Sequence, residues 1–535
     1  MMEIESIALK GNKVLQSYFE DQQFIHTFFD YENNETSYKE RLKELKMRSF
    51  QREKLSATIR SFMEPFGISE QAEVHLTEMK ENGVVVIGGQ QAGILTGPLY
   101  SVHKAITVIL LAKQKRKELG VPVIPVFWVA GEDHDLAEIN HVYTELNGKA
   151  IKQQYEEKFV LKWMASDAEY DQQQMTTYLQ EVFKKFGETE YTKDLLQDVL
   201  FAAQQEKTFT QFFVRLMNGF FQEEGLLFID SAYKTLRQME SPYFRQMIEG
   251  AAAISSSIVQ KEEEYCNFGF SQPLYAEEAA ANLFYVHETG RVLLSIKDGK
   301  FVNEQIGFRK TEKEMLEIAQ NEPWLLSNNV ATRPIMQDLI FPVLSFVGGP
   351  GEIAYWALLK EAFHHFDIKM PIITPRMSIT LITSKATQAL SDVSLTVEDV
   401  LQGRVAEERD RFIETLKNER FDKMVQKMEK DLEEQYKILT SEVSDGLLPI
   451  VEKNLDYHKK QFEFLRNKAE DELLRKHETA LRKYQLLDGQ LYVDGSLQER
   501  IYTPYSFMNT YGPDLIKNLL QLPFEMNGKH QIVYL

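Results

Sequence analysis

The chain has 535 residues, 43% of them hydrophobic, which is enough for a large buried core and about three or four structural units. Its formal net charge of −19 disfavours a broad nucleic-acid-binding surface, which needs concentrated lysine and arginine. A single cysteine, Cys266, excludes an internal disulfide, and no segment resembles a signal peptide or a membrane span. We therefore expect a cytoplasmic protein that binds neither nucleic acid nor membrane.

Residues 1–150 are predicted to hold N-terminal helices and the first half of an α/β core. Charged helical patterns end at the turn signal Asn82-Gly83, and a β-branched run at 84–87 follows. After a glycine-containing loop come a helical pattern from about Leu99 to Leu119 and a wholly apolar run at 121–130. This order predicts a βαβ unit in a parallel sheet covered on both faces.

Residues 151–330 lose this rhythm and are interpreted as an insertion. Helices are expected near 170–185 and 195–223, followed by a β-meander over 282–303. Apolar runs with glycine or proline after them return at 339–347 and 370–374, so residues 331–385 are expected to complete the sheet.

Residues 386–486 change to a composition rich in Glu, Lys, Arg, Gln and Leu with heptad-like spacing. This pattern predicts a long α-helical coiled-coil hairpin with its turn at Ser444-Asp445-Gly446 and arms of about 50–60 Å. Residues 487–535 have the Gly, Pro and Tyr content of a segment that packs back on the core.

The loop after the first predicted strand is the first candidate site. It contains Gly89, Gln90 and Gln91 and opens the helix that begins near Leu99. Ligands bind at this edge of doubly wound sheets, and helix N–H groups attract anions there. The loop fits neither GxxxxGK[ST] nor GxGxxG, so it predicts a phosphate site of another kind.

The continuation of this loop, TGPLYSVH, resembles the HIGH motif of class I aminoacyl-tRNA synthetases. It includes Thr96, Gly97 and Tyr100, the last in place of the first histidine, and His103 at the second histidine position. The alternative is that His103 only packs on the sheet at the start of a helix.

A second segment, Arg376-Met377-Ser378-Ile379-Thr380, is similar to the KMSKS loop of the same enzymes. Arg376 occupies the position of the first lysine, and Ile379 replaces the second. Positive groups such as His103, Lys104 and Arg376 can orient ATP and stabilise the charge that develops during carboxylate activation.

Acidic residues and histidines follow the second predicted strand. Asp133 is a candidate to hold a substrate ammonium, with Asp135 beside it, and His134 a candidate to take a proton from an attacking amine. The alternative is a helix start with capping-box spacing between Asp135 and Glu138. A zinc site using His134 and His141 is possible chemically but is not predicted, because no CxxC or HExxH pattern is present.

Candidate ligand groups also flank the returning strands. Arg333 could bind a carboxylate or phosphate, or form a surface ion pair. Gly348 and Gly349 would let a ligand approach the backbone, with Glu352 on a ribose hydroxyl, or would form only a tight turn. The polar segment GSLQER at 495–500 has no assigned role, and Cys266 is expected to be an inert buried thiol.

Together, GGQQAGILTGPLYSVHKA, FWVAGEDHDLAEINH, NNVATRPIMQD, FVGGPGEIAYW, PRMSIT and GSLQER closely resemble the cysteine-adding enzymes of bacillithiol biosynthesis over essentially the whole chain. The resemblance implies a Rossmann-like core with connecting-peptide insertions and a coiled-coil arm that forms a homodimer. It also implies an amide between the carboxylate of cysteine and the amine of glucosaminyl malate. The loops similar to HIGH and KMSKS suggest ATP, with Mg²⁺, for activation of the carboxylate.

The predicted roles group into three sets. Catalytic roles fall to His103, Lys104, Asp133 and His134. ATP-binding roles fall to Gly89, Gln90, Thr96, Gly97, Gly348, Gly349, Glu352, Arg376 and Ser378. Substrate-binding roles fall to Gln91, Tyr100, Asp135 and Arg333. An adenylate and an acyl-phosphate route both remain open.

Two other functions fit parts of the sequence. One is a synthetase-like protein that binds nucleotide or tRNA without ligase activity, which the acidic charge disfavours. The other is a coiled-coil scaffold whose sheet is only a support, which the glycine-rich loops at two strand ends disfavour.

Overall fold

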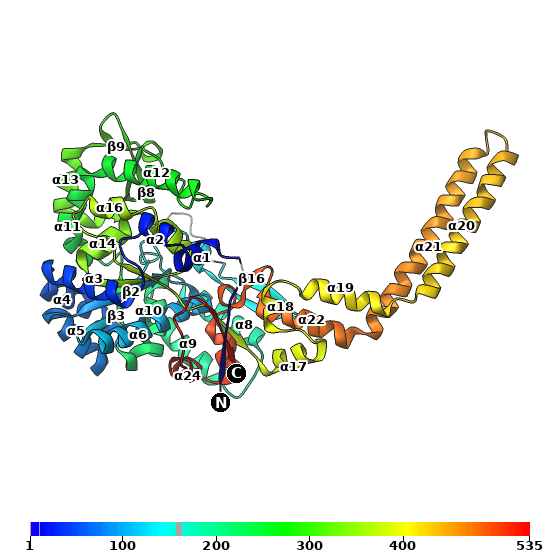
Figure 1. Ribbon diagram of the computed structural model, residues 1–535, viewed down its shortest axis with the longest axis horizontal. Helices are drawn as coiled ribbons and strands as arrows, with labels where there is room; N and C mark the ends of the chain where they lie inside the picture. The colour runs from blue at the N-terminus through cyan, green and yellow to red at the C-terminus, as the bar shows by residue number, and fades with distance from the viewer. Residues whose placement is uncertain (1, 10, 157–162) are drawn as a thin grey trace. The chain divides into compact units, whose positions relative to one another are not determined.

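The computed structural model describes residues 2–9, 11–156 and 163–535. They form two compact units (Figure 1). The first comprises Met1–Glu145, Ala150–Leu381 and Ser496–Leu535, and the second comprises Leu146–Lys149 and Ile382–Gly495. The tail after Gly495 therefore belongs to the same unit as the N-terminal half.

A five-stranded parallel sheet is the centre of the first unit, with strand order β13-β12-β2-β3-β6. Its strands are β2 (Val84–Gln90), β3 (Val123–Val129), β6 (Leu227–Asp230), β12 (Val343–Gly348) and β13 (Ile372–Pro375). Continuous β-branched and aromatic runs form these strands because both faces are buried. This confirms the predicted α/β class with a parallel sheet.

The edge strand β6 was not expected, because it lies in the segment interpreted as an insertion. It consists of only four residues, Leu-Phe-Ile-Asp, between helical stretches. A strand this short has too few residues for a periodic signal. The region 151–330 thus contributes to the core sheet as well as adding elements outside it.

Helices of the first unit pack on this sheet, on the second sheet described below and on one another. The helix predicted from Leu99 to Leu119 is α6 (Leu99–Leu119), which ends at Gly120 in the left-handed conformation. The others are α1 (Lys13–Glu20), α2 (Gln22–Phe28), α3 (Glu35–Met47), α4 (Arg52–Met63), α5 (Glu70–Glu81), α7 (Leu136–Ile139), α8 (Gln172–Phe186), α9 (Thr192–Gln205), α10 (Phe209–Phe221), α11 (Lys234–Glu249), α12 (Ala251–Asn267), α13 (Glu312–Asn321), α14 (Thr332–Ile340), α15 (Pro350–Trp356), α16 (Lys360–His364), α23 (Pro504–Tyr511) and α24 (Leu515–Leu520).

A second, antiparallel sheet has the order β10-β9-β8-β7-β11. Its strands are β7 (Ala280–His287), β8 (Gly290–Lys297), β9 (Lys300–Asn303), β10 (Phe308–Thr311) and β11 (Leu326–Asn328). Strands β7 to β9 are the predicted meander. Cys266, expected to be buried, is half-buried in α12.

The two ends of the chain meet in a third sheet, ordered β1-β17-β14, in which β1 and β17 are antiparallel. The strands are β1 (Glu3–Ile7), β14 (Ile379–Ile382) and β17 (His530–Tyr534), and the short strands elsewhere are β4 (His141–Leu146), β5 (Lys149–Gln154), β15 (Tyr492–Val493) and β16 (Ser496–Leu497). Short 3₁₀ helices are η1 (Glu64–Phe66), η2 (Ile94–Thr96), η3 (Gln222–Glu224), η4 (Glu304–Ile306), η5 (Pro323–Leu325) and η6 (Gln498–Arg500).

The second unit contains the predicted helical hairpin, whose arms α20 and α21 lie side by side (Figure 1). Its helices are α17 (Ser384–Val393), α18 (Val397–Leu401), α19 (Val405–Leu416), α20 (Glu419–Glu442), α21 (Leu448–Lys476) and α22 (Glu478–Leu491). The turn contains Ser444, Asp445 and Gly446 as predicted. The arms have 24 and 29 residues, or about 36 and 44 Å, because the chain breaks at Asn418 and His477. The predicted length was therefore too great.

Candidate active site

A cavity of about 610 Å³ lies in the first unit at the carboxyl ends of β2, β3 and β12. Parallel strands bring their carboxyl ends to one edge, so the loops that follow them converge there. The cavity is lined by the following residues from the predicted set: Gly89, Gln90, Gln91, Tyr100, Lys104, Asp133, Arg333, Gly349, Glu352 and Arg376. The remaining predicted residues, Thr96, Gly97, His103, His134, Asp135, Gly348 and Ser378, are not among its lining residues.

The end of β2 and the loop from there to α6 are tightly constrained. A Cβ at Gly89 would lie 2.3 Å from the carbonyl oxygen of Trp128. Leu95 and Thr96 have φ angles of 51° and 66°, and Gly97 follows at 68°. Thr96 is fully buried. Thr96 and Gly97 thus shape the approach to α6.

The first turn of α6 is less available to an anion than the sequence suggested. The N–H of Leu99 donates to the carbonyl oxygen of Tyr502 at 2.8 Å, and the N–H of Ser101 donates to that of Pro98 at 2.9 Å. Positive charge at this end of the cavity therefore comes from side chains.

Lys104 is the central cation of the cavity wall. Its side chain is almost fully buried, and its Nζ donates to the carbonyl oxygen of Gly89 at 2.7 Å, to Gln90 Oε1 at 3.2 Å and to Glu352 Oε2. Burial lowers the pKa of the Lys104 ammonium, and the Glu352 carboxylate opposes that shift.

Glu352 closes the turn after β12. Its Oε2 accepts the N–H of Gly349 at 2.7 Å, in a capping arrangement at the start of α15. The tight-turn interpretation of this segment is therefore correct. Oε1 of Glu352 has no partner among the described residues and so stays available at the cavity.

Two arginines of the cavity lack carboxylate partners within the part of the chain that the structure describes. Arg333 donates to the hydroxyl of Tyr355 at 2.6 Å, so the surface-ion-pair alternative is wrong for it. Arg500 lies with its guanidinium carbon 5.8 Å from the centroid of the Tyr100 ring. Both can meet an anionic ligand group bidentately.

Two carboxylates of the cavity share one amide. Gln91 Nε2 donates to Asp133 Oδ2 at 2.7 Å and to Glu138 Oε2 at 2.6 Å. Asp135 precedes α7, but its side chain makes no capping hydrogen bond. The helix start was therefore predicted correctly and the capping box was not, because Glu138 reaches Gln91 instead.

The histidines lie away from the cavity lining. His134 packs edge-on against Phe284 of β7, with ring centroids 5.8 Å apart. His141 pairs through Nδ1 with the carbonyl oxygen of Ala137 at 3.0 Å. Within the described residues, no group of three or more His, Cys, Asp and Glu side chains is placed to hold a metal ion.

His103 is fully buried on α6, with Nδ1 2.7 Å from Glu499 Oε2. Burial lowers the pKa of His103, which the Glu499 carboxylate opposes. Arg376 donates to both Glu499 oxygens, at 2.8 Å each, and Ser378 donates to Oε1 at 2.7 Å.

Glu499 and Arg500, both in η6, are functional candidates that the sequence left without a role. The only sequence signal was the polar segment GSLQER in the tail.

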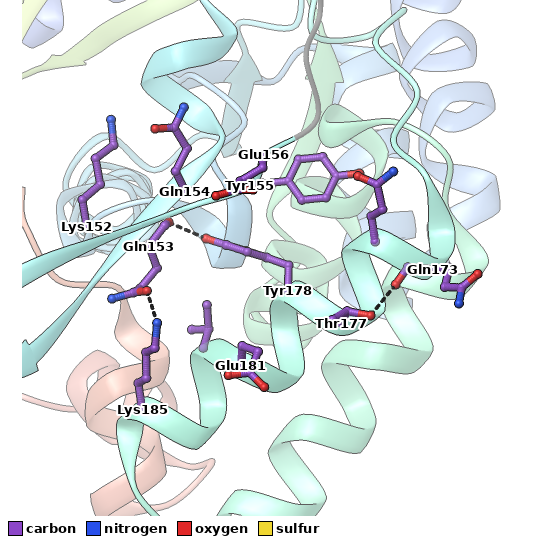
Figure 2. Close-up of a pocket in the computed structure, with 12 residues that line it drawn as sticks. Lys152, Gln153, Gln154, Tyr155, Glu156, Gln173, Thr177, Tyr178, Glu181 and Lys185 are labelled. Atoms are coloured by element: carbon purple, nitrogen blue, oxygen red, sulfur yellow. Dashed lines mark hydrogen bonds between the residues drawn. The ribbon is translucent and has the colours of Figure 1, made fainter.

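A second hollow, of about 670 Å³, lies between β5 and α8 (Figure 2). In it the hydroxyl of Tyr178 donates to the carbonyl oxygen of Gln153 at 2.8 Å, and Lys185 donates to the Gln153 side chain. None of the predicted site residues lines it. Size alone therefore does not identify the active site.

A parallel sheet whose strand ends carry a charged cavity defines a Rossmann-like enzyme core. Comparison with known proteins extends this assignment. Residues 2–377 match the N-terminal Rossmann-like domain of bacillithiol biosynthesis BshC, and residues 379–535 match its C-terminal coiled-coil domain. The chain therefore belongs to the BshC family of bacillithiol biosynthesis.

Similar full-length relatives carry one name, "Putative cysteine ligase BshC". The protein of Lysinibacillus sphaericus is 44% identical over 539 residues, with 100% of both chains covered. That of Geobacillus sp. strain WCH70 is 36% identical over 542 residues, also covering 100% of both. That of Geobacillus kaustophilus is 38% identical over 501 residues, covering 92% of each chain. Among the described residues, no helix combines the length and apolarity that a bilayer crossing requires.

Proposed function

We propose that this protein joins the carboxylate of cysteine to the amine of glucosaminyl malate as an amide, with ATP activating the carboxylate. One observation carries the proposal. A single cavity presents the guanidinium groups of Arg333 and Arg500, which lack carboxylate partners among the described residues, together with the carboxylate pair Asp133 and Glu138. Substrates that carry both ammonium and anionic groups match this arrangement.

The cationic groups are suited to phosphate and carboxylate oxygens. Lys104 and Arg376 are held by carboxylates, whereas Arg333 and Arg500 are open to ligand. A low-dielectric wall strengthens the interaction of such fixed charges with an anion. We assign phosphate orientation to Lys104 and Arg376, with Arg333 and Arg500 binding the remaining anionic groups.

The acidic groups are suited to the amine side of the reaction. Asp133 lines the cavity and has its Oδ2 fixed by Gln91. A carboxylate in this position can hold a substrate ammonium and receive a proton as the amine attacks. The predicted role of His134 as base stays a prediction, because its ring lies against Phe284 outside the lining.

The cavity lining suits ATP, since the cationic side chains of Lys104, Arg333, Arg376 and Arg500 all belong to it. When bound with Mg²⁺, ATP would supply a leaving group, because a carboxylate oxygen bonded to phosphorus can be displaced by the amine nitrogen with loss of one proton. Glu352 Oε1 is the free acceptor that could meet a ribose hydroxyl.

The test is mass-spectrometric detection of the amide after incubation of the purified protein with ATP, Mg²⁺, cysteine and glucosaminyl malate. We expect product only when all components are present, and serine in place of cysteine serves as the substrate control. Formation of AMP would indicate an adenylate route, and formation of ADP an acyl-phosphate route. Absence of product with folded protein would contradict the proposed reaction.

We also propose that the hairpin forms a homodimer. Its arms carry exposed apolar side chains, which are Met424, Met428, Ile438, Leu439, Ile450, Tyr457, Phe464 and Leu465. A second copy would bury this stripe, as in a four-helix contact. We further propose that the protein is cytoplasmic, which the use of ATP and free cysteine in the proposed reaction supports.

A further inference from the structure

The carboxylate of Glu499 connects two segments that lie far apart in the chain. Its Oε2 accepts from His103 Nδ1 at 2.7 Å and from the N–H of Ile379 at 3.1 Å. Arg376 spans both carboxylate oxygens, and Ser378 donates to Oε1. One side chain therefore accepts five hydrogen bonds, one from α6 and four from residues 376–379, which lead into β14.

The charge of Glu499 is retained despite complete burial. Burial alone would raise the pKa of this carboxyl group, but the Arg376 guanidinium and the hydrogen bonds from Arg376 and His103 hold it well below its usual value. An ionised carboxylate only accepts hydrogen bonds, so His103 must donate from Nδ1. The His103 tautomer is thereby fixed, with Nε2 left as an acceptor.

Each segment that Glu499 holds continues into the cavity. Lys104 follows His103 on α6 and forms part of the cavity wall, as does Arg376 itself. The guanidinium carbon of Arg376 lies 5.8 Å from the centroid of the Tyr100 ring, which is also part of the wall. Glu499 itself does not line the cavity. It can therefore act only through the residues that it holds.

We propose that Glu499 is a positioning residue that sets α6 and the Arg376 loop in one arrangement for carboxylate activation. The proposal rests on the proposed function for the step that it serves. It assigns no chemistry to Glu499, because the carboxylate is enclosed by protein donors. Its effect is on the placement of Lys104 and Arg376 relative to each other.

Two substitutions separate charge from length. Glu499→Gln keeps the length but replaces one acceptor oxygen by an amide donor that faces the donors of Arg376. Glu499→Asp keeps the charge but is one methylene shorter. Glu206→Gln is the matched control, since Glu206 is a buried carboxylate that pairs with Arg215 outside the cavity.

The first readout is the separation of kcat from KM in amide formation. Loss of charge-assisted hydrogen bonds to Arg376 predicts a fall in kcat of about 10- to 100-fold for Glu499→Gln, with KM for cysteine within about threefold. Partial rescue is expected in Glu499→Asp, and unchanged kinetics in Glu206→Gln. A kcat for Glu499→Gln equal to that of the unsubstituted protein would overturn the proposal.

The second readout does not depend on activity. Hydrogen exchange followed by mass spectrometry should show faster exchange in Glu499→Gln in both 99–107 and 376–382, and in neither segment for Glu206→Gln. A change in only one segment, or in none, would overturn the coupling. If the unsubstituted protein forms no amide, the proposed function is wrong. The hydrogen-exchange comparison of Glu499→Gln with Glu206→Gln then tests the positioning role by itself.

Discussion

Lys104 is a structural cation, and the functional role proposed for it can be separated from the structural one. Its ammonium is held by Glu352 and by the carbonyl oxygen of Gly89 in an almost fully buried position. Lys104→Met should lower the free energy of unfolding by about 1–3 kcal/mol, because it leaves the Glu352 carboxylate without its cation. It should also lower turnover about 100-fold through loss of a phosphate-orienting charge.

The double variant Lys104→Met/Glu352→Gln distinguishes these effects. Urea denaturation should show stability partly restored, since no charge is then left unpaired, whereas turnover should stay low. Recovery of turnover in the double variant would mean that Lys104 serves only to neutralise Glu352.

His530 predicts a pH dependence of stability. It pairs with Thr380 at 2.7 Å and Ser378 at 2.8 Å, and burial lowers its pKa to about 4. The unfolded chain takes up this proton near pH 6.5, before the folded chain does. Stability therefore falls as the pH decreases from about 6.5 to 4, by roughly 3 kcal/mol at most.

The measurement is the free energy of unfolding of the unsubstituted protein and of His530→Gln at several pH values. As the pH falls from about 6.5 to 4, the unsubstituted protein should lose unfolding free energy relative to His530→Gln. A constant difference from pH 7.5 to pH 4 would show that His530 is protonated equally in both states.

The sequence predicted which residues lie at the cavity only where those residues follow a predicted strand closely. Lys104, Asp133 and Arg376 meet at one cavity because parallel strands bring their following loops together. Glu499 was not predictable in this way, since it lies 396 residues from His103 and no local pattern encodes that hydrogen bond. The HIGH-like motif also could not predict that His103 lies outside the cavity lining, because the orientation of its ring depends on its hydrogen bond to Glu499.

At the scale of elements, Gly89 tests how closely β2 and β3 approach, and Gly351 is the comparison position. Both line the cavity, but a Cβ at Gly89 would meet the carbonyl oxygen of Trp128, and a Cβ at Gly351 would have no neighbour within 4 Å. Gly89→Ala should therefore lower the free energy of unfolding by about 1–3 kcal/mol, because backbone must move.

Gly351→Ala is the control, since Gly351 lies in the first turn of α15, where alanine favours the helix by up to about 1 kcal/mol. Urea denaturation of the two variants provides the comparison. Equal stability of Gly89→Ala and Gly351→Ala would contradict the close approach at Trp128.

Elements with a strong local signal were predicted well, and those without one were not. The bounds of α6 follow from its apolar pattern and from Gly120 after its last residue. Strand β6 was missed because four residues between helices carry no periodicity. The arms of the hairpin were predicted too long because the composition stays rich in charged residues and leucine on both sides of the breaks at Asn418 and His477 and does not mark them.

At the scale of the whole molecule, the hairpin can be separated from the chemistry. All of the residues that line the cavity belong to the first unit, and α20 and α21 belong to the second. Phe412 of α19 lies with its ring centroid 6.3 Å from that of His477, so the chain enters and leaves the hairpin at neighbouring points. A short Gly-Ser linker can therefore replace residues 418–476.

This truncated protein should keep kcat within about twofold, because it loses none of the cavity. It should be a monomer where the full chain forms the proposed dimer, because it loses the apolar stripe. Light scattering after chromatography gives the mass, and the amide assay gives kcat. Met428→Glu/Phe464→Glu in the full chain is the matched control, since it places charge on the stripe without shortening the hairpin. A folded, truncated protein that has lost turnover would mean that the hairpin takes part in the reaction, and a truncated protein that stays dimeric would place the dimer contact on the first unit.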